Sequence, residues 1–562
     1  MTAVATSEAG HLAPFDRTSR AYQRRWWILF VLCFSLLIIV VDNSILNVAL
    51  PDLQESLHAS NSQLQWMVDA YTLVFAGLLL TAGTLGDKFG RRGALQFGMA
   101  VFGVGSVLSA LAGSANHLIL TRGIMGIGGA FIMPATLSII TNTFPPEERG
   151  RAISFWAAVA GIGFALGPIS GGLLLSHFYW GSIFLVNVPI VVFALIAGFF
   201  LIPTSKDPSN TRVDVVGAAL SIVGLVALVY AIIDGPTAGW RSGKIDGIFL
   251  FAAVALGAFA WWESRVDHPM LDVNFFKNPR FTAASSGITL IFFAMFGSMF
   301  LLTQYFQFVM QYSALETGVR LLPMAVTMFF VAPLSARLVE YIGTKIVVAS
   351  GLLIASLSLF SFAFVPAQHI SYPSDVLWRL IVMAVGMGLV MAPATESIMG
   401  SLPRAKAGVG SAVNDTTRQV GGALGVAVVG SVMTSTYGPR IAESLRTSGH
   451  TTPADISSAK DGLGFALQIA ARTPGPAAAK IIADGQNAFV AGMHHAVVVA
   501  AIAAFIGFIV VSIWLPARAA NVEVFEDQDV VEKETEQAAV EEAAQRGPIP
   551  APAFASDVGP GR

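Results

Sequence analysis

The chain has 562 residues, of which 54% are hydrophobic and 12% are charged, and its mean hydropathy is +0.68. Soluble domains are about 45–50% apolar and about 25% charged, so this composition excludes a soluble globular protein and indicates an integral membrane protein. The net charge of −2 disfavours a nucleic-acid partner, and the single cysteine, Cys33, excludes an intrachain disulfide and any site of paired thiols.

The apolar residues fall into repeated blocks of about 18–25 residues, the length that an α-helix needs to cross about 30 Å of hydrocarbon. The sequence therefore predicts an all-α protein, not a membrane barrel. The first block is too long for a signal-peptide core and has no small-residue cleavage site, so we expect it to be retained. We predict fourteen spans, near residues 26–50, 66–86, 95–114, 117–140, 152–176, 180–202, 214–234, 246–262, 281–305, 318–340, 345–366, 375–399, 408–436 and 490–515.

Lysine and arginine are concentrated in alternate short loops, whereas the intervening loops near Gln54, Asn116 and His177 have almost none. By the positive-inside rule the basic loops are cytoplasmic, so both termini of this plasma-membrane protein are expected in the cytoplasm. The basic residues are Lys88, Arg91, Arg92, Arg149, Arg151, Lys206, Arg212, Arg265, Lys277, Arg280, Arg337, Lys345, Arg404 and Lys406.

An internal repeat predicts how the spans are grouped. Residues 83–92 align without gaps on residues 336–345, at a separation of 253 (336 − 83), and a second echo aligns Met133–Ile139 with Met391–Ile398. Two echoes in the same order suggest duplicated six-span halves with two further spans between them. Paired halves around a central cavity are, by analogy, a transporter architecture that works by alternating access. The predicted parts are a cytoplasmic tail at 1–25, halves at 26–202 and 281–515, a two-span linker at 203–280, an external loop at 437–486 and an acidic cytoplasmic tail at 516–562.

Asp42 lies deep within the first predicted span, where an ionisable group is costly and indicates a function. Removal from water disfavours a charged carboxylate, so such a group can bind and release a proton near neutral pH. The alternative is a structural ion pair between Asp42 and Arg122 of the fourth span.

Further candidate residues lie in other spans. Glu396 replaces Leu137 of the repeat, and an added carboxylate fits a proton site better than it fits packing. Asp415 and Arg418 are three residues apart, so they can neutralise each other on one helix face, and the pair can equally be structural. Asp69 is a candidate for the substrate cavity or a hydrated residue near the outer mouth. The other cavity candidates are Tyr71, Trp156, Tyr305, Arg418 and Gln419, with lipid contact as the alternative for the aromatic residues.

Five motifs resemble those of the major facilitator superfamily, over about residues 26–515. The motif Gly83-x-Leu-x-Asp87-x-x-Gly90-Arg91-Arg92 resembles the superfamily signature. The motif Arg122-x-x-x-Gly126-x-Gly128 is similar to its second motif, and Gly163-x-x-x-Gly167-Pro168-x-x-Gly171-Gly172 to its antiporter motif. The segments Asp42 to Pro51 and Asn414 to Gly422 resemble the fourteen-span drug/proton antiporter branch. One departure is that Gly181-Ser182 follows Trp180, where the family usually has Arg-Trp.

The resemblance implies a fold and a role for each motif. Arg122 would modulate Asp42 in a shared cavity, and the loop around Asp87 would latch the cytoplasmic side. The alternative is that the loop charges only anchor the loop, which explains the bases but not Asp87 or the glycines. Small residues at fourfold spacing from Gly163 permit close helix approach, which suits either a leak-tight contact between the halves or ordinary packing.

The predicted function is proton-driven export of amphiphilic, often cationic compounds by a monomer in lipid. The sequence contains no GxxxxGK[ST], HExxH, CxxC or GxSxG motif, so an ion gradient is expected to supply the energy, without a cofactor or an enzymatic reaction. The open alternatives are a lipid or metabolite exporter of the same fold, a receptor or scaffold that has lost transport, and an intramembrane enzyme.

Overall fold

The structure is a computed structural model that describes residues 19–205, 214–266, 269, 273–401, 407–448, 452–473 and 475–517. All the regular elements of the described chain are helices. Its helices are α1 (Arg20–Gln23), α2 (Arg25–Leu57), α3 (Asn61–Phe89), α4 (Arg91–Ala110), α5 (Ala115–Thr143), α6 (Pro146–His177), α7 (Ser182–Leu185), α8 (Asn187–Leu201), α9 (Val215–Ala238), α10 (Gly243–Glu263), η1 (Val273–Lys277), α11 (Pro279–Gln304), η2 (Tyr305–Val309), α12 (Ala314–Ile342), α13 (Thr344–Ser361), η3 (Phe362–Phe364), η4 (Tyr372–Leu377), α14 (Trp378–Met399), α15 (Ala407–Ser448), α16 (Pro453–Lys460), α17 (Leu463–Arg472) and α18 (Pro476–Trp514).

Twelve helical segments within these described ranges are long and apolar enough to cross a membrane. The prediction of an all-helical membrane protein that crosses the membrane many times is therefore confirmed. Helices α3 and α6, with 29 and 32 residues, are not among the twelve, so the count of fourteen spans stays a prediction.

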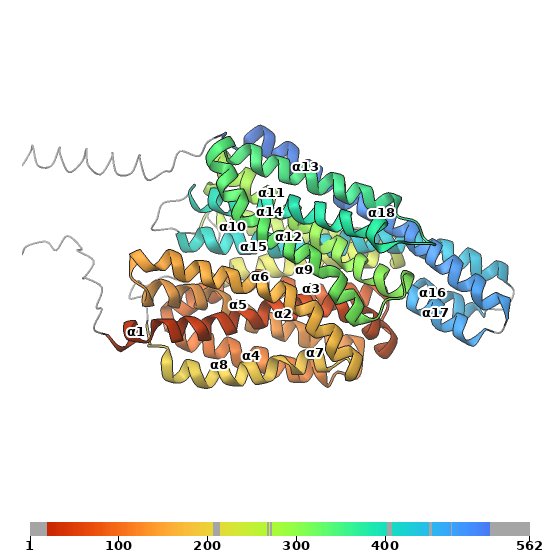
Figure 1. The fold of residues 1–562 in the computed structure, drawn as a ribbon, viewed down its shortest axis with the longest axis horizontal. Coiled ribbons are helices and arrows are strands. Elements are labelled where there is room, and N and C mark those ends of the chain that lie inside the picture. Colours follow the sequence, from red (N-terminus) through yellow and green to blue (C-terminus); the bar gives the residue numbers. More distant parts are fainter. Residues whose placement is uncertain are drawn as a thin grey trace, which may run out of the picture.

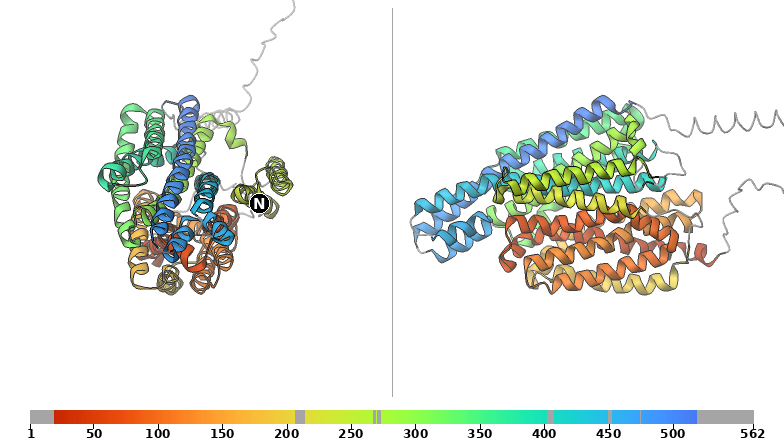
Figure 2. Two further views of the ribbon diagram at one scale, coloured as in Figure 1. Left: turned by 90° about the vertical axis from the view of Figure 1, so that its right-hand side faces the viewer. Right: turned by 180° about the vertical axis from the view of Figure 1, so that it is seen from behind.

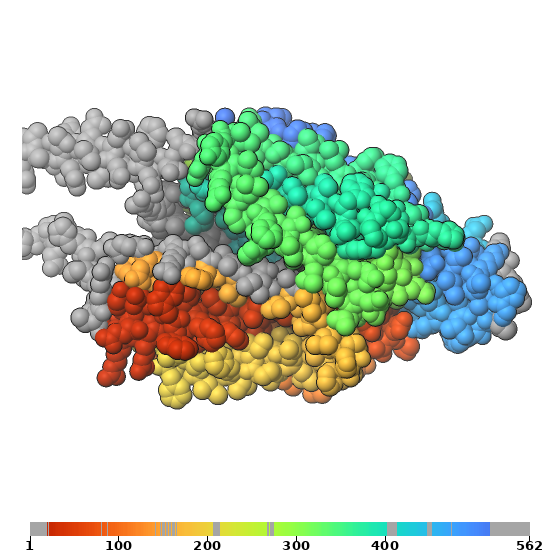
Figure 3. All heavy atoms as spheres, in the orientation of Figure 1, coloured from red at the N-terminus to blue at the C-terminus, as the bar shows by residue number. Residues whose placement is uncertain are grey.

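The helices form two layers, which Figures 1 and 2 show from three sides. We call α2 to α8 the N-terminal layer and α11 to α18 the C-terminal layer. The described chain enters and leaves at one end of the bundle, which we call the terminal end. Helices α16 and α17 project beyond the opposite end, which we call the hairpin end, and they form the protruding tip in Figure 3.

Two sharp turns between helices follow from matching glycines. Gly90 joins α3 directly to α4 with φ 122°, and Gly343 joins α12 to α13 with φ 85°. Both backbone angles are costly for residues with a Cβ. Because Gly90 and Gly343 occupy equivalent positions in the sequence repeat, the two segments have the same local construction.

The segment 437–486, expected to be a loop, is helical over most of its described length. Helix α15 continues to Ser448 and α18 begins at Pro476, with α16 and α17 between them. Thr452 caps α16 by accepting a hydrogen bond from the backbone of Asp455, whose carboxylate accepts one from the backbone of Thr452. This reciprocal capping box stabilises the start of α16, which the Ala-, Ser-, Thr-, Gly- and Pro-rich composition of the segment did not predict.

The two layers meet mainly through α6 against α12 and α3 against α15. Polar contacts between the layers lie toward the hairpin end. Gln307 of η2 donates to the carbonyl of Val48 at 2.7 Å, and Gln65 of α3 donates to that of Val426 at 3.5 Å. The hairpin formed by α16 and α17 also contacts the N-terminal layer, because the backbone N–H of Asn61 donates to the carbonyl of Asp461 at 2.7 Å.

Candidate functional site

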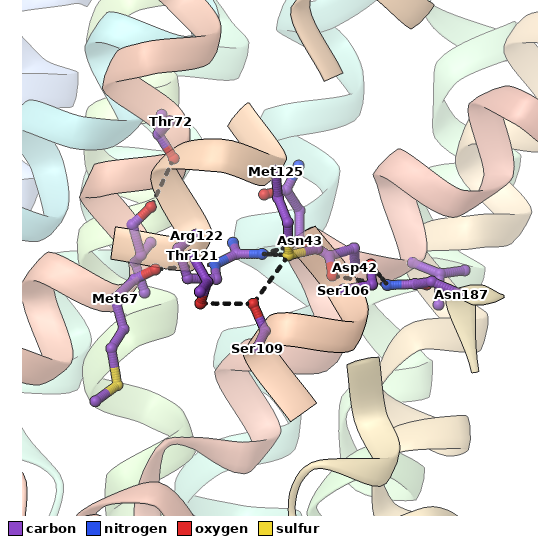
Figure 4. A network of polar contacts seen from close by, with 12 residues as sticks. Asp42, Asn43, Met67, Thr72, Ser106, Ser109, Thr121, Arg122, Met125 and Asn187 are labelled. Atoms are coloured by element: carbon purple, nitrogen blue, oxygen red, sulfur yellow. Dashed lines mark hydrogen bonds and ion pairs between the residues drawn. The ribbon is translucent and has the colours of Figure 1, made fainter. Parts of the chain in front are cut away.

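A buried polar network lies inside the N-terminal layer (Figure 4). Asp42 of α2 and Arg122 of α5 form an ion pair between Oδ2 and Nη1, and both side chains are inaccessible to solvent. The second oxygen of Asp42, Oδ1, accepts a hydrogen bond from the Asn187 amide at 3.0 Å. Each oxygen of the carboxylate therefore accepts a hydrogen bond from a different helix, Oδ2 from α5 and Oδ1 from α8.

Arg122 is fixed by helix α3 as well. Its Nε donates to the carbonyl of Met67 at 3.1 Å, and its guanidinium carbon lies 4.5 Å from the centre of the Tyr71 ring. A buried charge pair is tolerated only when such contacts satisfy its remaining donors. The network consequently joins α2, α3 and α5, and a substitution of Asp42 is expected to alter the packing of all three helices.

Asn187 is a site residue that the sequence analysis missed. It begins α8 just after the break at Val186 that separates α7 from α8, and its amide also lies 3.4 Å from the hydroxyl of Ser106 in α4. The available signal was one carboxamide in an otherwise apolar block, which in membrane helices often marks an interhelical hydrogen bond.

Asp69 of α3 has a different environment from Asp42. Its side chain is fully buried, and neither carboxylate oxygen has a hydrogen-bond partner among the residues that the structure describes. In this conformation the side chain is therefore shielded from bulk solvent, and its role in a cavity stays a prediction. Gln65, one helical turn earlier, donates to α15, and Leu73, one turn later, belongs to the same buried cluster as Ala423 of α15. This spacing puts Asp69 on the face of α3 that meets the C-terminal layer.

Comparison with known proteins identifies the family. The pattern described as Major Facilitator Superfamily matches residues 32–426. The chain belongs to the Major Facilitator Superfamily. The resemblance inferred from the motifs is confirmed, and as a member of this family the protein is a membrane transporter, not an enzyme.

Two curated relatives match most of the chain. The multidrug efflux pump LfrA of Mycolicibacterium smegmatis is 33% identical over 485 residues, which cover 86% of this chain and 95% of LfrA. The methyl viologen resistance protein SmvA of Salmonella typhimurium is 30% identical over 498 residues, covering 87% and 98%. A solved bacterial homolog of the human lysosomal transporter Spinster, in an inward-facing and occupied conformation, has a TM-score of 0.63 at 18% identity, over 88% of this chain and 98% of that one. The last similarity shows a common fold.

The superfamily signature loop contacts the end of α8. The backbone N–H of Arg91 donates to the carbonyl of Ser205 at 3.1 Å, and the Arg92 guanidinium donates to that of Ile202 at 3.4 Å. A cation at a helix C-terminus satisfies its free carbonyls and complements the helix dipole. Gly83 packs near Pro134 of α5. The side chain of Asp87 lies outside the described residues, so its predicted pairing stays a prediction.

The antiporter motif puts α6 between the two layers. Gly163 and Gly167 lie against α2, where a Cβ on Gly167 would be 2.8 Å from that of Ser44, and Gly171 faces Ile45 of the same helix. Gly172 faces the other way, and its Cβ would lie 2.7 Å from the carbonyl oxygen of Ala314 in α12.

Helix α12 contributes a matching glycine to this crossing. A Cβ on Gly318 would lie 2.7 Å from the carbonyl carbon of Pro168. Each helix thus supplies a glycine where the other backbone approaches, and the ladder forms a close interhelical contact between the layers.

The aromatic candidates for a cavity lie in packed surroundings. Tyr71 and Tyr305 are fully buried, and the Tyr305 hydroxyl donates to the carbonyl of Pro366 at 3.2 Å. Trp156 of α6 is partly exposed, and its indole N–H donates to the hydroxyl of Thr136 at 3.2 Å. Their contact with a substrate stays a prediction.

In the C-terminal layer, Asp415 and Arg418 of α15 lie 3.8 Å apart and are partly exposed. Arg418 also donates to the hydroxyl of Thr395 at 2.9 Å, and Gln419 beside it is partly exposed. Glu396 is exposed in the last turn of α14, at the terminal end, so its surroundings differ from the deep burial of Asp42. Proton coupling by Glu396 and Asp415 stays a prediction.

Proposed function

We propose that this protein exports amphiphilic and cationic drugs and other toxic compounds across the plasma membrane in exchange for protons. Two findings support the proposal: membership of a transporter superfamily, and relatives over most of the chain that carry the names of a multidrug efflux pump and a methyl viologen resistance protein. An ion gradient can drive this work, because one charge that crosses 100 mV contributes about 2.3 kcal/mol.

We further propose that α3 and α6 also cross the membrane, which gives fourteen spans arranged as six, two and six. The N-terminal layer is then the first half, α9 and α10 are the two added spans, and α11 to α15 with α18 form the second half. The basic loops put the terminal end in the cytoplasm, so the hairpin end faces outward. The contacts between the layers near the hairpin end then correspond to a conformation that is closed toward the outside.

The observation that carries the proton-coupling proposal is that two buried carboxylates of one layer have opposite surroundings. Asp42 forms an ion pair with Arg122 and accepts a hydrogen bond from Asn187. Asp69 is fully buried, and neither of its carboxylate oxygens has a hydrogen-bond partner in the described chain. An isolated buried carboxylate costs so much free energy that it is neutralised instead. Asp69 therefore holds a proton in this conformation.

The isolated position of Asp69 explains how proton movement and cargo movement can be coupled. Asp69 lies on the face of α3 that closes against α15, so the seam between these two helices can close only after a proton or a cationic cargo has neutralised the carboxylate. A carrier that has released its cargo outside then returns to the cytoplasmic side only with a proton. Competition of proton and cargo for one acid links the two fluxes.

Dye efflux from cells that express the protein tests the proposal. We expect wild-type cells to extrude several cationic dyes, and a protonophore to abolish the extrusion. Asp69→Asn mimics the protonated acid, so it is expected to abolish proton-driven efflux at normal expression, whereas Asp234→Asn, in the partly exposed pair with Lys244, is the control. Efflux by Asp69→Asn that is as strong and as protonophore-sensitive as in wild type would remove this residue from the mechanism. Unchanged accumulation of every dye in wild-type cells would favour a lipid or metabolite cargo.

A further inference from the structure

Helix α9 lies along the line where α3 and α15 meet, and it packs against both of them. Figure 2 shows α9 and its antiparallel neighbour α10 as a pair to one side of the main bundle. The pair thus sits where the N-terminal and C-terminal layers join, on the outer edge of the seam that contains Asp69.

Side chains from all three helices form a small separate core over this seam. Leu73 of α3, Val229 and Ile233 of α9, and Ala423 and Ala427 of α15 are each at most 2% exposed and form one cluster. The α15 contribution consists of two small residues, so the branched side chains from α9 supply most of the cover on that side.

Close approach of α9 to α3 requires a glycine. A Cβ on Gly77 would overlap the side chain of Ile222. Gly77 lies one turn beyond Leu73 on α3, so the contact continues along the seam toward the terminal end.

Hydrogen bonds tie α9 to both layers. Pro236 has no N–H, so the carbonyl of Ile232 lacks its usual helical donor. The hydroxyl of Ser431 in α15 donates to this carbonyl at 2.7 Å. From the other layer, the hydroxyl of Ser62 in α3 donates to the carbonyl of Ile233 at 3.5 Å. Polar contacts of this kind hold membrane helices together where the hydrophobic effect cannot.

Asp69 lies beneath this cover. It follows Ser62 by two turns and precedes Leu73 by one, so it lies on the part of α3 that α9 and α15 cover together. It is eight residues into α3, about 12 Å from the hairpin end of the helix at 1.5 Å per residue. At this depth a seam covered only by lipid would leave the acid close to the headgroup region, where water and ions are present.

We propose that α9 is a proton-tight seal over the α3–α15 seam, and that its function is to prevent Asp69 from exchanging protons sideways with the membrane surface. The inference depends on the proposed role of Asp69 in proton coupling. Helix α10 packs against α9, and its far face carries large exposed apolar side chains, including Leu250 and Val254, which suit contact with lipid. In this arrangement the two added spans keep a proton carrier from leaking.

The experiment measures proton entry without cargo. Purified full-length protein is reconstituted into phosphatidylcholine and phosphatidylglycerol vesicles that contain a pH-sensitive dye, and an inward proton gradient is imposed. We expect slow entry for wild type and a rise of several-fold for Val229→Ala/Ile233→Ala, which thins the seal. The matched control is Leu250→Ala/Val254→Ala on the exposed face of α10, and its leak should equal that of wild type.

Adding Asp69→Asn to the Val229→Ala/Ile233→Ala variant should return the leak to the wild-type level, because the side path ends at this acid. A leak that persists in the triple variant would overturn the proposal. So would an unchanged leak in the thinned variant, provided that its elution profile and melting temperature show a folded protein. If the double variant does not fold, Ser431→Ala makes the same test by removing one hydrogen bond.

The outcome is separable from that of the proposed function. Dye efflux and its protonophore sensitivity in wild-type cells test export, whereas the leak is measured with no dye to export. Wild type that exports dye while its thinned variant stays proton-tight would reject only the seal.

Discussion

Asn187 donates a 3.0 Å hydrogen bond to Asp42 across 145 residues of sequence, on the oxygen that Arg122 does not occupy. The amide thereby gives the second oxygen of this buried carboxylate a hydrogen-bond donor and links α8 to α2. Since α8 begins at this residue, a movement of α8 relative to α2 would change the hydrogen bonding of the acid.

Asn187→Ala is therefore expected to reduce dye efflux while the protein still folds. Its removal leaves one buried oxygen of Asp42 without a donor, at a cost of about 1–3 kcal/mol. The matched control is Ser106→Ala, since the Ser106 hydroxyl accepts a hydrogen bond from the same amide at 3.4 Å (Figure 4). Efflux rates normalised to membrane expression provide the measurement. Equal efflux from the two variants would show that the bond to Asp42 has no role in transport.

Arg122→Met should destabilise the protein far more than the loss of a surface charge does. It leaves the Asp42 carboxylate buried without its cation, which typically costs about 3–5 kcal/mol. The double variant Asp42→Asn/Arg122→Met removes both charges and should recover much of the lost stability. Melting temperatures in detergent measure this difference. A double variant that is no more stable than Arg122→Met would contradict a direct pair in the folded protein.

The sequence predicted the parts of this site that depend on local pattern. Spans follow from the length of apolar blocks, and the position of Asp42 inside the first block is enough to identify it as a candidate functional residue. The motif around Gly90 lies at a sharp turn between α3 and α4, where that glycine has a φ of 122°. The pairing of Asp42 with Arg122 was one of two interpretations, and the ion pair is present.

What the sequence could not provide depends on tertiary contacts. The bond from Asn187 to Asp42 arises only when α8 packs beside α2. Whether Asp69 has a partner depends on the neighbouring α15, which lies some 350 residues further along the chain, beyond the reach of any local pattern. The repeat identified Glu396 as a candidate proton site, but its exposed position in the last turn of α14 depends on the tertiary structure and was not predicted.

A side chain at the crossing of α6 and α12 should block transport. We expect Gly172→Val to abolish efflux, because its Cβ would meet the backbone of Ala314 and Leu315 and push the two layers apart. The control is Gly247→Val in α10, where no described atom would lie within 4 Å of an added Cβ. Expression measured by a C-terminal fluorescent tag separates misfolding from loss of function. Normal efflux by Gly172→Val would mean that the layers do not need this close contact.

The docking of the hairpin on the N-terminal layer provides the last prediction. Asp461 accepts the backbone N–H of Asn61, and the neighbouring Gly462 has no side chain to separate it from Gln54 of α2, which is buried against it. Gly462→Leu should lift α16 and α17 from the turn between α2 and α3 and weaken closure toward the hairpin end. The protein would then spend more time open at that end, with slower net efflux and faster hydrogen exchange at the amide of Asn61. The matched control is Gly438→Ala on α15, where the nearest described atom is 3.8 Å from the added Cβ. Unaltered exchange at Asn61 in Gly462→Leu would show that this glycine does not hold the hairpin in place.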